Sequence, residues 1–145
     1  MLSMVSDSRR GSDPSSGPGA SAERGADLIG VRVLVVEDEA MVAMLIEDIL
    51  LDLGCVVLGP APSVDAALKL LDEGTVDAAV LDINLSGEMV FPVADALEGQ
   101  GVPFVFSTGY GMAGLEGRHL DRPVLQKPYQ PARLRAALMT ALGRS

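Results

Sequence analysis

Several residue types are scarce in this chain of 145 residues, and each scarcity excludes a class of protein. A single cysteine, Cys55, excludes a disulfide scaffold and a zinc site built from several cysteines. Lys and Arg number 11 against 20 Asp and Glu, a net charge of −9, which argues against nucleic acid and anionic membranes as partners. No apolar run approaches the roughly 20 residues that span a bilayer. We therefore expect no nucleic-acid partner and no membrane partner.

The first 28 residues are poor in large apolar side chains. They hold 7 Ser, 4 Gly and 2 Pro, and such a segment buries too little apolar surface to offset the entropy lost on ordering. The adjacent Arg9 and Arg10 are not followed by the apolar stretch of an export signal. We predict a disordered leader over residues 1–28, a folded domain over residues 29–145, and a cytoplasmic location.

From residue 29 onward, segments typical of strands alternate with segments typical of helices. The predicted strands are short apolar runs at residues 31–36, 55–59, 78–81, 102–106 and 124–126. The predicted helices, with apolar residues at helical spacing, cover residues 39–53, 63–73, 90–97 and 131–142. Four glycines within residues 109–117 predict that a further helix, the fourth in order, is short or irregular. This pattern predicts an α/β fold, a doubly wound five-stranded parallel sheet.

The side chains at the carboxyl ends of the predicted strands are polar. For the first, third, fourth and fifth strands they are, in order, Glu37 and Asp38, Asp82, Thr108, and Lys127. In an open parallel sheet these ends share one rim, where ligands bind. Carboxylate oxygens are the ligands that Mg²⁺ prefers, and an ammonium with a hydroxyl opposite them suits phosphoryl oxygens. The rim therefore predicts a Mg²⁺ site and phosphoryl transfer to the Asp82 carboxylate.

Four short motifs, in this order along the chain, resemble the receiver domain of bacterial two-component response regulators. They are VVEDE at 35–39, VLDINL at 80–85, FSTGY at 106–110 and LQKPY at 125–129. The resemblance covers about residues 30–143 and implies the flavodoxin-like receiver fold. It also implies a phosphoprotein in a phosphorelay, which takes its phosphoryl group from a histidine kinase.

The resemblance assigns roles to the residues at the rim. It implies that Asp82 is the phosphoacceptor and that Thr108 and Lys127 engage the phosphoryl oxygens. In the Mg²⁺ site it implies, one acidic residue binds directly, a second acts through water, and the residue two beyond the phosphoacceptor supplies a backbone carbonyl. The implied metal set is Asp38 as the direct ligand, Glu37 through water, Asp82, and Asn84 through its carbonyl.

The chain departs from the usual receiver pattern in three places. A Leu-Ser pair stands at 85–86 where the family has Met-Pro, and Val124 stands where it has a switch aromatic. An aromatic residue, Tyr110, instead follows Thr108 by two positions, as in a subgroup with a Phe-Ala-Thr-Gly-aromatic motif and a poorly formed fourth helix. We predict that Thr108 and Tyr110 form the switch and that phosphorylation orders residues 109–122; the alternative is that Tyr110 merely covers the surface.

Two further residues have structural interpretations. Glu39 begins the predicted helix over 39–53, where a carboxylate favours the helix dipole, so we expect it to cap that helix. His119 is the only histidine, and its glycine-rich surroundings predict a loop residue rather than a phosphotransfer histidine.

Three functions are compatible with these patterns. The first is a single-domain response regulator, a monomer or weak dimer that is not an enzyme beyond its own phosphorylation and dephosphorylation. It would signal to a downstream protein by contact or act as a phosphate sink. The second is a pseudo-receiver scaffold that works without phosphorylation, although a scaffold has no physical need for the full set of rim residues. The third is an aspartyl-phosphate phosphatase, which would need a second Asp where Asn84 stands.

Overall fold

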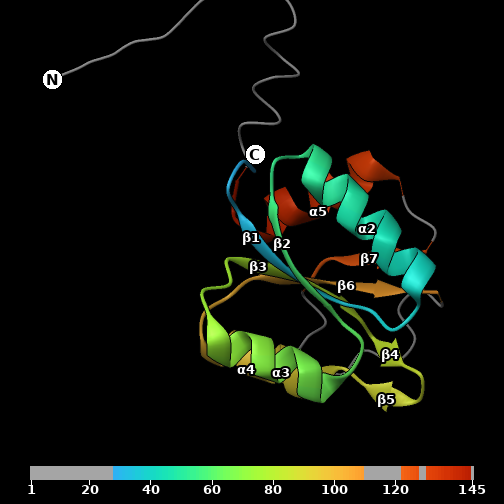
Figure 1. The fold of residues 1–145 in the computed structure, drawn as a ribbon. Helices are drawn as coiled ribbons and strands as arrows, with labels where there is room; N and C mark the ends of the chain where they lie inside the picture. Colours follow the sequence, from blue (N-terminus) through green and yellow to red (C-terminus); the bar gives the residue numbers. More distant parts are fainter. Residues whose placement is uncertain (1–27, 110–121, 128–129, 145) are drawn as a thin grey trace, which may run out of the picture.

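A computed structural model describes residues 28–109, 122–127 and 130–144. Five strands form the central sheet: β1 (Arg32–Val36), β2 (Val56–Ala61), β3 (Ala78–Asp82), β6 (Phe104–Thr108) and β7 (Val124–Gln126). The described helices are α2 (Ala40–Asp52), α3 (Val64–Glu73), α4 (Phe91–Gly99) and α5 (Pro131–Ala141). Two short strands, β4 (Asn84–Leu85) and β5 (Glu88–Met89), form a separate hairpin. The central sheet is parallel, in the order β2-β1-β3-β6-β7 (Figure 1).

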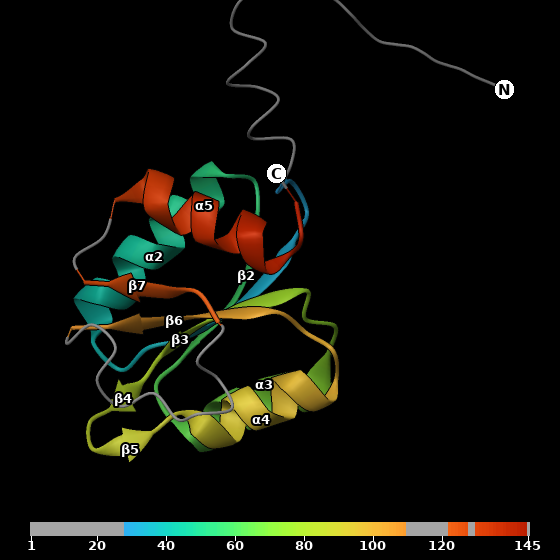
Figure 2. The same ribbon diagram turned by 180° about the vertical axis from the view of Figure 1, so that it is seen from behind.

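Both faces of the sheet are covered, which explains why its strands are apolar along their length. Val33 and Val35 of β1 belong to one buried cluster, together with residues of α2 and α5. Leu34 and Val36 belong to the other, together with residues of α3 and α4. Figures 1 and 2 show these two pairs of helices on opposite sides of the sheet. The predicted fold class, a doubly wound five-stranded parallel sheet, is confirmed.

The helices lie close to their predicted positions, and the signals that predicted their ends can be followed in the structure. Ser63, where the predicted helix begins, caps α3, because its hydroxyl accepts a hydrogen bond from the backbone N–H of Ala66 at 3.2 Å. Pro92 lies in the first turn of α4, and Pro131 begins α5. A proline is tolerated there because its missing N–H would have no partner in the helix.

The second strand is longer than predicted. The strand was predicted to end at Gly59, before Pro60, yet β2 continues to Ala61. Because β2 is an edge strand, a proline can be accommodated in it without breaking the sheet. Gly59 itself has a φ of +97°, and a Cβ at this position would lie 2.9 Å from the carbonyl oxygen of Val35. Glycine is therefore required where β2 passes close to β1.

The hairpin of β4 and β5 was not predicted. Asn84 pairs with Met89 and Leu85 with Glu88, which leaves Ser86 and Gly87 as a two-residue turn. Both turn residues have positive φ, 54° and 94°, as a type I′ hairpin turn requires. A serine seldom adopts such a conformation, so the sequence carries only a weak signal for this turn. The hairpin follows β3 directly and thus lies at the functional rim of the sheet.

Several predictions concern residues outside the described ranges. The predicted leader lies there except for its last residue, and so do residues 110–121 of the glycine-rich segment 109–122, where the short or irregular fourth helix was predicted. The first described residue, Leu28, is fully buried, so packed structure includes the residue just before the predicted domain boundary. None of the helices within residues 28–109, 122–127 and 130–144 has the length and apolar character needed to span a bilayer.

Candidate functional site

Polar residues from the strand ends meet on one face of the sheet. Asp82 lies opposite Ser107 of the neighbouring strand β6, and alternation of side chains along β3 puts it on the same face as Val80, towards α2 and α5. By the same alternation Glu37, one residue beyond β1, and Lys127, one residue beyond β7, fall on this face. The parallel sheet thus brings together three side chains that are far apart in the sequence.

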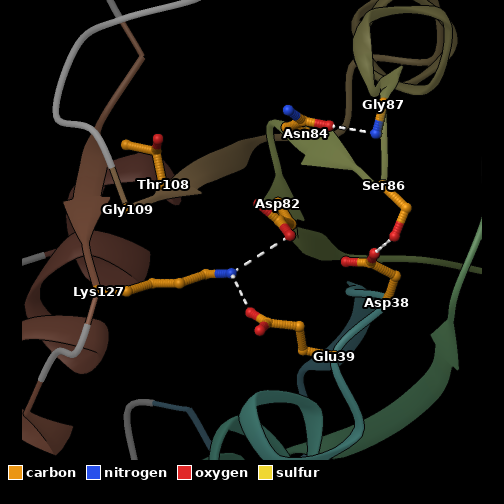
Figure 3. Close-up of a pocket in the computed structure, with 9 residues that line it drawn as sticks. All are labelled: Asp38, Glu39, Asp82, Asn84, Ser86, Gly87, Thr108, Gly109 and Lys127. Atoms are coloured by element: carbon orange, nitrogen blue, oxygen red, sulfur yellow. Dashed lines mark hydrogen bonds and ion pairs between the residues drawn. The ribbon is translucent and has the colours of Figure 1, made fainter.

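Lys127 is the centre of the cluster. Its ammonium nitrogen lies 3.0 Å from Glu37 Oε1, 3.2 Å from Asp82 Oδ2 and 3.6 Å from Glu39 Oε1. Figure 3 shows the Lys127 side chain extending from β7 towards Asp82 and Glu39. The carboxyl groups of Glu37 and Asp82 are buried, whereas the Glu39 side chain is 65% exposed. One ammonium is therefore shared by two enclosed carboxylates and one that faces solvent.

A cleft of about 420 Å³ opens above this cluster. Its lining comes from the ends of β1, β3, β6 and β7 and from the β4–β5 hairpin (Figure 3). The lining residues are Asp38, Glu39, Asp82, Asn84, Ser86, Gly87, Thr108, Gly109 and Lys127. A phosphoryl group entering the cleft would meet carboxylate, hydroxyl and ammonium groups on its walls.

The hairpin closes one side of the cleft and contacts the acidic residues. The hydroxyl of Ser86 donates a hydrogen bond to Asp38 Oδ2. The side-chain oxygen of Asn84 accepts a hydrogen bond from the backbone N–H of Gly87 at 2.7 Å, which holds the turn in shape. The Asn84 side chain is therefore engaged within the hairpin.

Burial and mutual repulsion shift the ionisation of the clustered groups. Burial is the main cause that raises the pKa of Glu37 from 4.5 to about 7; Lys127 opposes the rise and Asp82 adds to it. Burial also raises the pKa of Asp82, against the lowering effect of Lys127. For Lys127, burial acts to lower the pKa, but hydrogen bonding and attraction to the carboxylates outweigh it and the pKa is raised. The site thus carries more negative charge than its one ammonium neutralises.

The donor set suits a divalent cation. Carboxylate oxygens of Glu37, Asp38 and Asp82 lie within 4.8 Å of one another. Hard oxygen ligands in a partly open site are those that Mg²⁺ prefers, because it keeps several of its waters. A cation here would also relieve the repulsion that, after burial, contributes to the raised pKa values of Glu37 and Asp82.

The structure can be compared with the residues that the sequence analysis singled out. Those described by the structure lie in the cleft or directly beneath it: Glu37, Asp38, Asp82, Asn84, Thr108 and Lys127. Tyr110, the second residue of the predicted switch, and His119 lie outside the described residues. Ser86 was not predicted as a site residue, although its replacement of the family's usual proline was a signal.

The prediction for Glu39 was right about its position and wrong about its side chain. Glu39 is the N-cap residue of α2, but its carboxylate makes no capping hydrogen bond. It lies beside the Lys127 ammonium instead. A contact with a residue so distant in the sequence leaves no local signal, which is why the pattern around position 39 indicated only a helix start.

Comparison with known proteins gives a consistent result. The family model of the response regulator receiver domain matches residues 33–139. The chain is 33% identical over 130 residues to the phyllosphere-induced regulator PhyR of Methylorubrum extorquens, a match that covers 85% of this chain and 47% of PhyR. The chain spans about half the length of the curated relatives it matches.

Solved structures are similar over most of the chain. SdrG from Sphingomonas melonis Fr1 is 43% identical with a TM-score of 0.71, and the match covers 78% of this chain and 96% of SdrG. The BeF3-activated conformation of SdrG, from Pseudomonas melonis Fr1, is 42% identical over 77% of this chain and 95% of SdrG, with a TM-score of 0.67. The receiver domain of Erythrobacter litoralis PhyR is 27% identical with a TM-score of 0.71, over 79% of this chain and 92% of that domain.

Proposed function

This chain belongs to the response regulator receiver domain family, and on that premise we propose that it is a single-domain response regulator whose Asp82 accepts a phosphoryl group from a histidine kinase. The observation that carries the proposal is the position of the Asp82 carboxylate. It lies at the end of β3, in an open cleft, 3.2 Å from the Lys127 ammonium and close to two further carboxylates.

The chemistry follows from these groups. An Asp82 carboxylate oxygen attacks the phosphorus, the bond between phosphorus and the donor's histidine nitrogen breaks, and the imidazole leaves with the electron pair. Lys127, which now contacts the Asp82 carboxylate, offers its ammonium to the incoming phosphoryl oxygens. Thr108, at the end of β6 and lining the cleft, offers a hydroxyl to another of these oxygens.

The acidic residues fit the proposed Mg²⁺ requirement. Glu37, Asp38 and Asp82 would hold the ion, with the backbone carbonyl of Asn84 as a further ligand. Mg²⁺ bound there would supply positive charge that offsets the negative charge on the phosphoryl oxygens during transfer. Ser86 contributes by orienting Asp38 through its hydrogen bond.

The relatives support a single-domain receiver that is activated by phosphorylation. The match covers nearly all of SdrG, and SdrG has a BeF3-activated conformation; fluoroberyllate is an analogue of a phosphoryl group. We propose that the leader is disordered up to the buried Leu28, and that the protein is located in the cytoplasm as a monomer or weak dimer. Its output is contact with a downstream protein, or removal of phosphate from a shared kinase, with Thr108 and Tyr110 as the switch.

The test is phosphorylation by a small donor. The full chain is incubated with acetyl phosphate and Mg²⁺, and its intact mass is compared with that of Asp82→Asn and of a control, Asp72→Asn, which makes the same chemical change at an exposed position of α3. We expect one phosphoryl group on the wild type and on Asp72→Asn, none on Asp82→Asn, and none with EDTA. A folded wild-type protein that never takes up a phosphoryl group would contradict the proposal and favour a phosphorylation-independent scaffold.

A further inference from the structure

Glu39 is the N-cap residue of α2, but its side chain does not cap the helix. It precedes α2 in an extended conformation, with φ −87° and ψ 116°, and its backbone carbonyl accepts the first hydrogen bond of the helix, from Ala43, at 2.9 Å. A capping side chain at this point stabilises a helix by about 1 kcal/mol. The carboxylate of Glu39 nevertheless makes no such bond, and the first turn of α2 contains no other acidic residue.

The carboxylate lies instead at the mouth of the cleft, beside the group that must receive the phosphoryl oxygens. Lys127 is the only cationic residue among the described residues that line the cleft. Its contacts with Glu37 and Asp82, at 3.0 and 3.2 Å, are fixed by the sheet and enclosed. Its contact with Glu39 is longer, 3.6 Å, and open to solvent. Glu39 is thus the carboxylate that is free to move when the site is filled.

Resting on the proposed function, we propose that Glu39 is a specificity-determining residue that selects phosphodonors by their charge. In the unphosphorylated protein its carboxylate pairs with the Lys127 ammonium. The same carboxylate repels small anionic donors that approach Asp82. With acetyl phosphate, the bond between Asp82 Oδ and phosphorus forms while the bond between phosphorus and the acetyl oxygen breaks, and acetate leaves. Glu39 opposes the binding of this donor twice, by direct repulsion and by competition for the ammonium.

The size of the effect should follow the charge of the donor. Coulomb energy is proportional to the product of the charges, so a dianion such as acetyl phosphate is opposed about twice as strongly as phosphoramidate, whose net charge is −1. For a partly solvated carboxylate at the cleft mouth, we expect loss of the charge to raise the second-order rate of phosphorylation roughly tenfold with acetyl phosphate and about threefold with phosphoramidate. The repulsion energy is proportional to the donor's charge, whereas the rate depends exponentially on that energy. Twice the charge therefore squares the factor, from about threefold to about tenfold.

The experiment compares the two donors on the full chain in saturating Mg²⁺, with intact mass as the readout. Glu39→Gln removes the charge and keeps the size of the side chain. Glu39→Asp retains the charge, and Glu73→Gln removes one exposed charge at the last residue of α3, far from the cleft. Far-UV circular dichroism of each variant verifies folding, and each rate is measured at low and at high ionic strength.

Several outcomes are distinguishable. The proposal is supported if Glu39→Gln is phosphorylated faster than wild type and if this acceleration is larger with acetyl phosphate and is reduced by salt. It further requires that Glu73→Gln stays close to wild type and that Glu39→Asp, which keeps the charge, is accelerated less than Glu39→Gln. Slower phosphorylation of Glu39→Gln with both donors would mean that Glu39 only positions Lys127. Equal acceleration of this variant with both donors would exclude selection by charge. Either result overturns the inference and leaves the proposed function standing. If the wild type takes no phosphoryl group from either donor, the proposed function fails and this inference fails with it.

Discussion

Replacing Asp82 by asparagine should stabilise the Mg²⁺-free protein, although it removes the proposed phosphoacceptor. Carboxylate oxygens of Glu37 and Asp38 lie within 4.8 Å of Asp82. At that upper distance each repels it by about 3.5 kcal/mol at an effective dielectric constant of roughly 20. The attraction to Lys127, at 3.2 Å, is about 5 kcal/mol on the same scale. The two repulsions together exceed the attraction, and we expect a net stabilisation of about 2 kcal/mol in the variant. The pKa of Asp82 is raised mainly by burial, which also disfavours the charged carboxylate and therefore acts in the same direction.

The assay is thermal unfolding of wild type and Asp82→Asn, followed by circular dichroism at pH 8, where Glu37 is ionised. In EDTA we expect the variant to melt roughly 8 °C higher than wild type. Saturating Mg²⁺ should narrow or reverse this gap, because the ion binds the folded wild type and stabilises it by mass action. Asp72→Asn should melt close to wild type under both conditions.

One result would refute the reasoning. If Asp82→Asn melts below wild type in EDTA, the attraction between Asp82 and Lys127 outweighs the repulsion, and the cluster is not strained by its own charge. The argument that a cation is needed to relieve that charge would then lose its basis.

Three further predictions follow from the same structure. Burial raises the pKa of Glu37 to about 7, so between pH 4.5 and 7 the folded state binds more protons than the unfolded state. The free energy of unfolding without Mg²⁺ should therefore fall by about 3 kcal/mol as the pH rises across this range. Urea titrations of Glu37→Gln should show a smaller fall. The buried Ser107 hydroxyl has no hydrogen-bond partner among the described residues, so Ser107→Ala should gain about 1 kcal/mol in urea unfolding, and a loss would reveal a partner. Hydrogen exchange over residues 109–122 should slow on phosphorylation, and unchanged exchange would argue against the proposed switch.

The rim of the site could be predicted because parallel strands impose it. Once the strands ending near Glu37, Asp82 and Lys127 are recognised, their carboxyl ends must lie at one edge of the sheet. The alternation of side chains then places the three groups on one face, where they make the contacts seen in the structure. This information is local to each strand, which is why it can be extracted from short sequence motifs.

The features that the sequence did not predict depend on long-range contacts or on rare backbone conformations. The second strand was predicted to end before Pro60, and the edge position of β2 explains why the strand continues through this proline. Ser86 adopts a positive φ that serine propensity does not favour, so the hairpin and its contact with Asp38 were missed. Glu39 was interpreted from its neighbours along the helix, whereas its partner, Lys127, lies on another strand.

The most direct test of the central claim is to locate the phosphoryl group on the chain. Borohydride reduces an aspartyl phosphate to homoserine, and peptide mass spectrometry then identifies the reduced position. After incubation with acetyl phosphate and Mg²⁺, we predict homoserine at position 82 and nowhere else, and none when either reagent is omitted. Homoserine at another aspartate, or intact Asp82 in a protein that has gained a phosphoryl group, would contradict the assignment of Asp82 as the phosphoacceptor.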